Sequence, residues 1–291
     1  MQTVGRFAPS PSGRMHLGNV LCALLAWLSA RHQNGAFLLR IEDLDAMRCP
    51  RSYADLIMDD LRWLGLDWDG EVPYQSERAP IYEKYEQILR EKGLLYPCFC
   101  SRAALHAASA PHLSDGRVLY AGTCRELTPA EIEEKRKKRA PATRVRVPDE
   151  IISFTDGVFG AYSENLAEEC GDFIIRRSDG VFAYQLAVTV DDGLSGVTEV
   201  VRGSDLISST PRQIWLYRLF GFEPPHFVHI PLLCDVDGRR LSKRDEDLDL
   251  GLLRERFTPE QVIGALAFAA HLTDRAEPAS VRELVQDFDW S

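Results

Sequence analysis

The sequence predicts an α/β protein that contains a parallel sheet. Strand, helix, strand and helix patterns follow one another over the first 66 of its 291 residues. Strands that alternate with helices are joined by crossovers, which favours parallel pairing. The pattern changes after residue 97, and a chain of this length suggests about two domains or one domain with an insertion. We therefore expect an α/β core that an insertion interrupts.

The elements of the first half follow from hydrophobic spacing. Apolar residues recur with helical periodicity after Leu17, and Ser52 and Gly93 have the chemistry of a helix N-cap and a helix stop. In chain order, we expect a strand at 4–8, a helix at 17–32, a strand at 36–45, and helices at 52–66 and 79–93.

The second half begins with a region of turns, cysteines and one charged helix. After it, the strand-like segments FIIRR and VFAYQLAVTV flank the turn SDG, which predicts an antiparallel hairpin. Ser209 or Thr210 and Thr258 are expected to cap the later helices, and Gly221 to end one of them. The remaining expected elements are a helix at 209–221, a strand at 229–233, a polar loop at 235–247 and a helix at 258–270.

Composition excludes several classes of protein. The chain is 45% hydrophobic and 27% charged, and it has no apolar run approaching the roughly 20 residues of a membrane helix. Its N-terminus lacks a secretory pattern, so we expect a cytoplasmic protein with no membrane partner. Seven scattered cysteines argue against a disulfide framework. A net charge of −10 argues against non-specific polyanion binding but allows a local basic patch.

Two polar loops carry the strongest chemical signals. PSPSGRMHLGN, residues 9–19, joins the first strand to a helix N-terminus, an arrangement that favours anions; Gly13 and Gly18 allow close approach and His16 can donate to a phosphate. Alternatively, residues 9–19 form a well-capped turn between the strand and the helix, with no bound anion. GRRLSKRDE, residues 238–246, concentrates cations that could neutralise a triphosphate, although they could also pair with the acidic run at 245–249.

Together these loops resemble the HIGH and KMSKS signatures of class I aminoacyl-tRNA synthetases. Their flanking segments resemble glutamyl-tRNA synthetases over about residues 4–260. The resemblance implies a Rossmann-like class I synthetase catalytic core, a zinc-bearing insertion and a short helical C-terminal subdomain. The expected parts are 1–96 and 173–234 for the two halves of the core, 97–172 for the insertion, and 235–291 for the second signature loop and helical subdomain.

The resemblance also implies an activity. Glutamyl-tRNA synthetases carry a large helical anticodon-binding region where only about 45 residues follow Arg244 here. The chain thus resembles truncated paralogues, which implies that ATP activates L-glutamate for transfer to queuosine in the anticodon loop of tRNA(Asp). A minimal glutamyl-tRNA synthetase that charges a 3′ end and a non-catalytic RNA-binding paralogue are the alternatives. We expect a monomer.

Glutamate offers two carboxylates and one ammonium to a binding site. Arg6 and Arg202 can each fork onto a carboxylate, Tyr184 can donate its hydroxyl, and Glu42 can hold the ammonium. The resemblance assigns glutamate binding to these four residues, and to Ala8 and Ser10. It assigns ATP binding to Pro9, His16, Gly18, Asn19 and Lys243, with His16 and Lys243 as the catalytic residues. Magnesium is expected to accompany ATP.

Closely spaced cysteines predict a structural zinc site. Cys98 and Cys100 form CFC, and Cys124 ends YAGTC. Spacing leaves the fourth ligand open among His106, His112 and Tyr120; the resemblance implies Tyr120, with His112 in reserve. Three reduced cysteines without metal are the alternative.

A basic segment, EKRKKRAPATRVR at 134–146, is the expected place for RNA phosphates. The alternative is a solvated helix face, since Glu131–Lys135, Glu133–Lys137 and Glu134–Lys138 have i,i+4 spacing.

Overall fold

The computed structural model describes residues 2–101, 119–233 and 249–290. At its centre, β1 (Val4–Phe7) pairs in parallel with β2 (Ala36–Leu39), and β8 (Glu199–Gly203) pairs in parallel with β9 (His226–Ile230). The Thr198 N–H donates to the Val4 carbonyl at 2.9 Å, which places β8 beside β1. The predicted parallel pairing is confirmed, although β2 is shorter than expected and β9 begins before residue 229.

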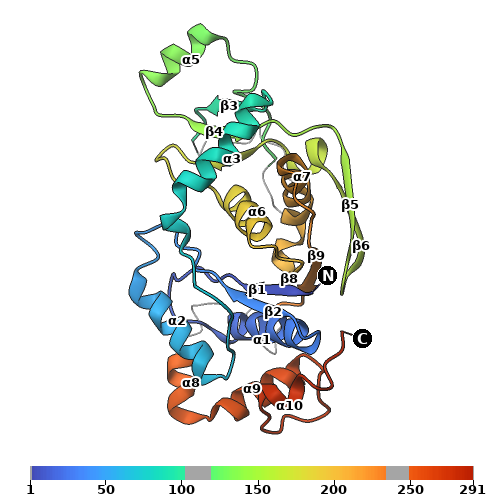
Figure 1. Ribbon diagram of the computed structural model, residues 1–291. Coiled ribbons are helices and arrows are strands. Elements are labelled where there is room, and N and C mark those ends of the chain that lie inside the picture. The colour runs from blue at the N-terminus through green and yellow to red at the C-terminus, as the bar shows by residue number, and fades with distance from the viewer. Residues whose placement is uncertain (1, 102–118, 234–248, 291) are drawn as a thin grey trace.

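Helices cover both faces of these strands (Figure 1). The helix α1 (Leu17–His32) packs on one face, and α6 (Tyr184–Leu194) and α7 (Thr210–Phe220) lie on the other. Successive strand side chains point to opposite faces. Accordingly, Val201 and Val228 belong to the apolar cluster around α1, whereas Val200 and Phe227 belong to the cluster around α6 and α7. The strands are therefore buried on both sides.

The predicted hairpin at 173–190 is largely wrong. Its first arm is β7 (Phe173–Arg176), and the turn closes through Arg177 N–H donating to the Val181 carbonyl at 2.8 Å. The second arm ends at once, because α6 begins at Tyr184. The β-branched residues in VFAYQLAVTV suggested a strand, but Leu186, Ala187 and Val190 follow helical spacing and are fully buried. Tertiary burial outweighs strand propensity here.

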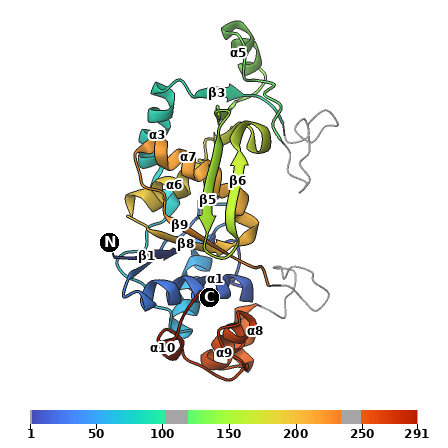
Figure 2. The same ribbon diagram turned by 90° about the vertical axis from the view of Figure 1, so that its right-hand side faces the viewer.

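A second, antiparallel sheet connects the two halves of the core. Its order is β3 (Leu95–Cys98), β4 (Ala142–Val145) and β7. The expected boundary after residue 96 falls inside β3, so that division stays a prediction. The helix α5 (Pro129–Arg136) lies between β3 and β4 in the chain. The hairpin of β5 (Ile151–Asp156) and β6 (Gly160–Asn165) packs against α7 and β9 and is followed by a π-helical turn at Leu166–Cys170. The helix α5 occupies one end of the molecule in both views (Figures 1 and 2).

The remaining helices pack around the core. Thr258 caps its helix as predicted and accepts from Gln261 N, and Gly221 ends α7 with φ of 74°. The predicted Ser52 cap is wrong, because Pro50 precedes the helix, and Ser209 precedes α7 without a side-chain cap bond. The remaining helices are α2 (Arg51–Trp63), α3 (Ala79–Glu91), α8 (Leu250–Arg256), α9 (Pro259–Ala269) and α10 (Val281–Leu284), with short 3₁₀ turns at Gln75–Glu77 and Ser204–Ser209.

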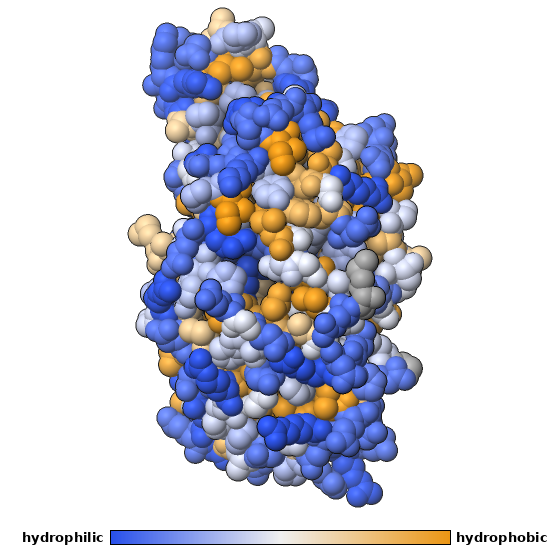
Figure 3. Space-filling model, viewed as in Figure 1, coloured by the Kyte–Doolittle hydropathy of each residue, from blue (hydrophilic) through white to orange (hydrophobic). Residues whose placement is uncertain are grey.

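The surface in the orientation of Figure 1 is mainly hydrophilic, with scattered hydrophobic patches (Figure 3). Among the helices that the structure describes, none is long and apolar enough to cross a bilayer.

Candidate functional site

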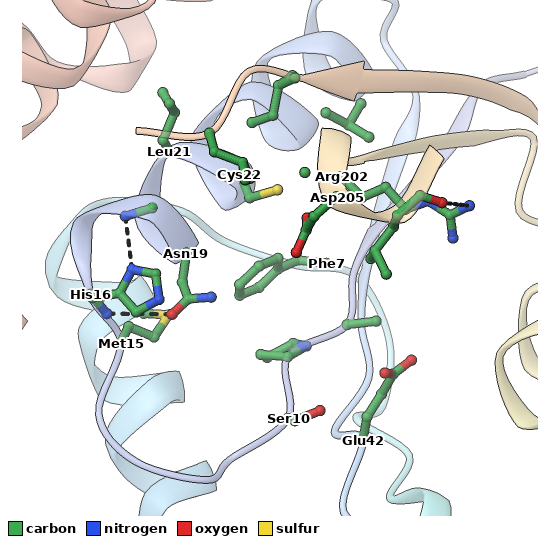
Figure 4. Close-up of a pocket in the computed structure, with 18 of the residues that line it drawn as sticks. Phe7, Ser10, Met15, His16, Asn19, Leu21, Cys22, Glu42, Arg202 and Asp205 are labelled. Atoms are coloured by element: carbon green, nitrogen blue, oxygen red, sulfur yellow. Dashed lines mark hydrogen bonds between the residues drawn. The ribbon is translucent and has the colours of Figure 1, made fainter. Parts of the chain in front are cut away.

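A cavity of about 470 Å³ opens where β1 and β8 end. Every described residue that the sequence assigned to glutamate or ATP lines it (Figure 4). Lys243 lies outside the described residues. The lining includes the predicted residues Arg6, Ala8, Pro9, Ser10, His16, Gly18, Asn19, Glu42, Tyr184 and Arg202. Segments far apart in the sequence thus form one site, while the individual roles of these residues stay predictions.

A buried carboxylate, Asp192, organises one side of the cavity. It accepts from Arg6 Nε at 3.3 Å and from Arg40 Nη1 at 2.6 Å. Arg40 also donates to Glu42 at 3.0 Å. Burial acts to raise the pKa of Asp192, but the charges of Arg40 and Arg6 outweigh it and hold that pKa below its usual value. Asp192 therefore fixes the directions of two guanidinium groups.

Glu42 provides a negative group at the cavity wall. Its burial raises the pKa, and the charge of Arg40 only partly offsets that effect. A ligand ammonium beside Glu42 would favour its ionised form. This environment suits the predicted contact with the amino group of glutamate.

The two arginines of the cavity differ in the hydrogen bonds left to them. Arg6 donates to Asp192 and to the Val201 carbonyl at 3.1 Å, which leaves further N–H groups without a partner among the described residues. Arg202 uses all five N–H groups inside the protein. Its acceptors are Tyr184, Gln213, Thr210, His229 and the Leu206 carbonyl. A direct fork from Arg202 onto a carboxylate would therefore require an exchange of partners.

Tyr184 lines the cavity and is hydrogen-bonded to Arg202. Its hydroxyl oxygen accepts from Arg202 Nη1 at 3.3 Å. The hydroxyl proton is consequently free to point toward a ligand, as the sequence predicted for this residue.

His229 holds Arg202 from behind the cavity. It is fully buried, its Nδ1 lies 2.6 Å from Asp156 Oδ2, and its Nε2 lies 3.0 Å from Arg202 Nε. Arg202 can only donate, so Nε2 accepts and Nδ1 carries the proton that Asp156 accepts. Burial and the charge of Arg202 lower the pKa of His229 to about 4. The sequence did not reveal the hydrogen bonds that join Asp156, His229 and Arg202, because Asp156 lies 73 residues before His229.

The first signature loop differs from the predicted open anion cradle. His16 caps α1: its Nδ1 accepts from Gly18 N at 3.1 Å, and its carbonyl accepts from Asn19 N at 2.9 Å. Those amides are thus already engaged. A neutral His16 must carry its proton on Nε2, and Asn19 Oδ1 accepts from His16 N at 3.4 Å, which leaves the amide group of Asn19 as a donor. The Gly18 and Asn19 amides are therefore not open to an anion, and the predicted phosphate contacts would have to come from the side chains of His16 and Asn19.

Gly18 makes room for the histidine ring. A Cβ there would lie 2.9 Å from His16 Cε1. The glycine that the sequence assigned to close approach of a ligand therefore accommodates the protein's own side chain.

Cys22 and Asp205 are among the cavity residues to which the sequence assigned no role. Cys22 follows Asn19 by three positions and so shares its helix face, a spacing that could have indicated it. Burial raises the pKa of the Cys22 thiol to about 11, which keeps it protonated. Asp205 also lines the cavity, three positions after Arg202.

Three cysteines come together beside Tyr120. The sulfur atoms of Cys98, Cys100 and Cys124 all lie within 4.8 Å of one another, and the Tyr120 oxygen lies 3.6 Å from Cys98 Sγ and 4.0 Å from Cys100 Sγ. Among the residues described here, this is the one His, Cys and carboxylate group with metal-binding geometry. Three thiols and a phenol suit a tetrahedral metal. His106 and His112 lie outside the described residues.

Arg144 supplies positive charge to the cysteine cluster. It donates to Cys98 Sγ at 3.2 Å and stacks 3.7 Å from the centre of the Tyr120 ring. Burial acts to raise the pKa of Cys98, but hydrogen bonds from Cys100 N–H and Arg144 lower it overall. Burial raises the pKa of Tyr120, so its phenolate would need the charge of a bound metal.

The basic segment is smaller than predicted. Residues 135–139 are exposed, but Arg144 is buried at the cysteine cluster, and Arg146 stacks on Tyr96 and pairs with Glu126 at 2.7 Å. The predicted i,i+4 pairs are also wrong. The ion pairs found have i,i+3 spacing: Glu133 with Arg136 at 3.8 Å and Glu134 with Lys137 at 2.9 Å.

Comparison with known proteins agrees with this architecture. Residues 2–269 match the family model of class I tRNA synthetases (E and Q), catalytic domain. The glutamyl-Q tRNA(Asp) synthetase of Symbiobacterium thermophilum is 50% identical, with 98% of this chain and 92% of that protein covered. That of Nitratidesulfovibrio vulgaris is 48% identical, with 97% and 90% covered.

A solved structure shares the fold. The glutamate tRNA ligase from Elizabethkingia meningosepticum, crystallised in complex with its amino acid, superimposes with a TM-score of 0.82 at 28% identity, and this chain spans 65% of its length. The parallel strands, the two flanking helical layers and the matched model define a class I tRNA synthetase catalytic domain. Within that class of ligases, the chain belongs to the glutamyl-Q tRNA(Asp) synthetase family.

The pH dependence of stability should show the buried state of His229. Its pKa is about 4 when folded and about 6.5 when unfolded, so the unfolded chain binds more protons below pH 6.5. We expect this residue to lower the free energy of unfolding by about 2 kcal/mol between pH 7.5 and pH 5. His229→Gln should lose that dependence in urea denaturation.

The half-exposed His226 should affect the pH dependence of stability in the opposite direction to His229. The Glu199 carboxylate, 3.8 Å from the His226 Nδ1, raises the pKa of His226, so the stabilising contribution of this pair is present below pH 6.5 and is lost as the pH rises through the folded pKa. Identical pH dependence of stability in wild type and His229→Gln would contradict the account of His229.

Proposed function

We propose that this protein activates L-glutamate with ATP to form glutamyl-adenylate and transfers the glutamyl group to queuosine in the anticodon loop of tRNA(Asp). The observation that carries the proposal is the convergence of Arg6, Glu42 and Tyr184 with the first signature loop on one cavity. The set offers cationic and hydroxyl donors for two carboxylates and an anion for one ammonium. Relatives named glutamyl-Q tRNA(Asp) synthetase support the choice of acceptor.

The proposed chemistry has two steps. A carboxylate oxygen of glutamate attacks the α-phosphorus of ATP, and pyrophosphate leaves. A nucleophilic group of queuosine then attacks the glutamyl carbonyl, and AMP leaves. Arg6, Glu42 and Tyr184 position glutamate, His16 and Asn19 donate hydrogen bonds to phosphate oxygens, and Lys243 neutralises phosphate charge. Magnesium would accompany ATP and share that charge.

Label transfer tests the acceptor. Radiolabelled glutamate and ATP are mixed with tRNA(Asp) from cells that can and cannot make queuosine, and with tRNA(Glu). Each labelled tRNA is then cleaved to locate the label. We expect label only in the anticodon-loop fragment of queuosine-containing tRNA(Asp), including a preparation that lacks its 3′-terminal adenosine.

The other outcomes select the alternatives. Label at the 3′ end of tRNA(Glu) would identify a minimal glutamyl-tRNA synthetase. No label on any tRNA, together with no glutamate-dependent pyrophosphate exchange, would indicate a non-catalytic RNA-binding paralogue.

The cysteine cluster is proposed to hold one structural zinc ion, with Cys98, Cys100, Cys124 and Tyr120 as ligands. Bound metal would link β3 to the segment that ends at Cys124 and so stabilise this part of the insertion. We expect one zinc per chain by elemental analysis, and a lower melting temperature after chelation.

Tyr120→Phe tests the fourth ligand. We expect at least about tenfold weaker zinc affinity, because a tetrahedral site would lose one donor. Tyr96→Phe is the matched control, since the nearby Tyr96 hydroxyl donates to Asp172 at 2.6 Å rather than to a cysteine. Wild-type zinc affinity in Tyr120→Phe would exclude this ligand. Wild-type protein that contains no zinc after refolding in the presence of zinc would exclude the site.

The exposed cations at 135–139 are proposed to contact RNA phosphates. Lys135 and Lys138 form no ion pair with other described residues, which leaves their charge available.

A further inference from the structure

Asp60 is a buried carboxylate outside the cavity that binds two arginines from distant parts of the chain. It belongs to α2, and its side chain has no exposed area. Arg14, from the first signature loop, donates to it through Nε at 3.1 Å and Nη2 at 2.8 Å. Arg254, from α8, donates to it through Nη1 at 2.7 Å. One carboxylate thus joins the loop before α1 to the helix that follows residue 249.

The backbone reinforces this connection. Leu250 N–H donates to the Met15 carbonyl at 3.0 Å, and His16 pairs with Asp249 in an antiparallel bridge. A Cβ on Gly251 would lie 2.5 Å from Arg14 Nη1, so glycine there lets the Arg14 side chain pass to Asp60. The first signature loop and residues 249–251 are therefore packed as one unit (Figure 1 shows α2 and α8 side by side).

The position of this unit bears on the cavity. Arg14 lies between Gly13 and Met15, both of which line the cavity, and His16 follows. At the other side, Leu233 lines the cavity and Asp249 pairs with His16. These two residues border positions 234–248, which include Lys243 in the sequence. Neither Asp60 nor Arg254 lines the cavity. Any effect of these two residues on ATP must act through Arg14 and the backbone.

We propose that Asp60 is a positioning residue for ATP: by holding Arg14 and Arg254 together, it fixes the first signature loop relative to the chain that flanks the second. The inference rests on the proposed function, because it assigns ATP to this side of the cavity. Glutamate contacts lie on Arg6, Glu42 and Tyr184, which Asp60 does not touch. Loss of the Asp60 carboxylate should therefore weaken the use of ATP and leave the KM for glutamate nearly unchanged.

Asp60→Asn tests the proposal, with Asp59→Asn as the matched control. Both carboxylates accept from Arg254 Nη1, but Asp59 is largely exposed and does not bind Arg14. The assay is glutamate-dependent pyrophosphate exchange in the presence of tRNA. In Asp60→Asn we expect kcat/KM for ATP to fall about tenfold to a hundredfold, since small displacements of positioned groups have effects of that order. The KM for glutamate should change less than twofold, and Asp59→Asn should resemble wild type in both.

Arg254→Gln keeps the proposal falsifiable if Asp60→Asn does not fold. Arg254 is partly exposed and lines no part of the cavity, yet we expect its loss to raise the KM for ATP. Where Asp60→Asn folds, Arg254→Gln should add nothing to its effect in a double variant. A lower melting temperature in Arg254→Gln with unchanged KM for ATP would show a merely structural role and overturn the proposal. Absence of exchange in the wild type would instead contradict the proposed function.

Discussion

The cavity depends on one buried charge interaction, that of Asp192 with Arg6 and Arg40. Asp192 is 2% exposed, and removal of ionised groups from water is costly unless opposite charges compensate. Two guanidinium groups on one carboxylate give that compensation and also fix both arginines in direction. Arg6 then faces the ligand space, and Arg40 reaches Glu42. The predicted cationic and anionic ligand contacts, Arg6 and Glu42, are thereby both positioned by Asp192.

Arg202 faces the same cavity but is organised differently. Its N–H groups are all used by protein acceptors, and the Asp156–His229 pair fixes its Nε. The carboxylate contact available without rearrangement is therefore the hydroxyl of Tyr184, which Arg202 orients. One arginine of the cavity is ready to bind a ligand directly, and the other supports a neutral donor.

Residue types and spacing predicted the parallel strands and most helices. The residues that the family resemblance assigned to glutamate and ATP line one cavity wherever the structure describes them. Residue types and spacing did not predict α6, where Val188 and Val190 suggested a strand. Residues 186–192 are all buried in α6, so the segment shows no exposed face whose spacing would distinguish a helix from a buried strand. The His16 cap was also missed, because the hydrogen bonds of an imidazole cannot be read from a motif. Asp60 and Asp156 were missed because their partners lie far away in sequence and meet only in the folded chain.

The glutamate KM of Asp192→Asn tests most directly whether this carboxylate organises the cavity. Asp191→Asn is the matched control, since Asp191 is equally buried and also lies 3.6 Å from Arg40 Nε, but it binds Gln75, Arg78 and Tyr82 and does not bind Arg6. Loss of a charged hydrogen bond costs about 1.5–3 kcal/mol, which corresponds to about tenfold to a hundredfold in affinity. The account predicts that increase in Asp192→Asn alone. A wild-type glutamate KM in folded Asp192→Asn would contradict it.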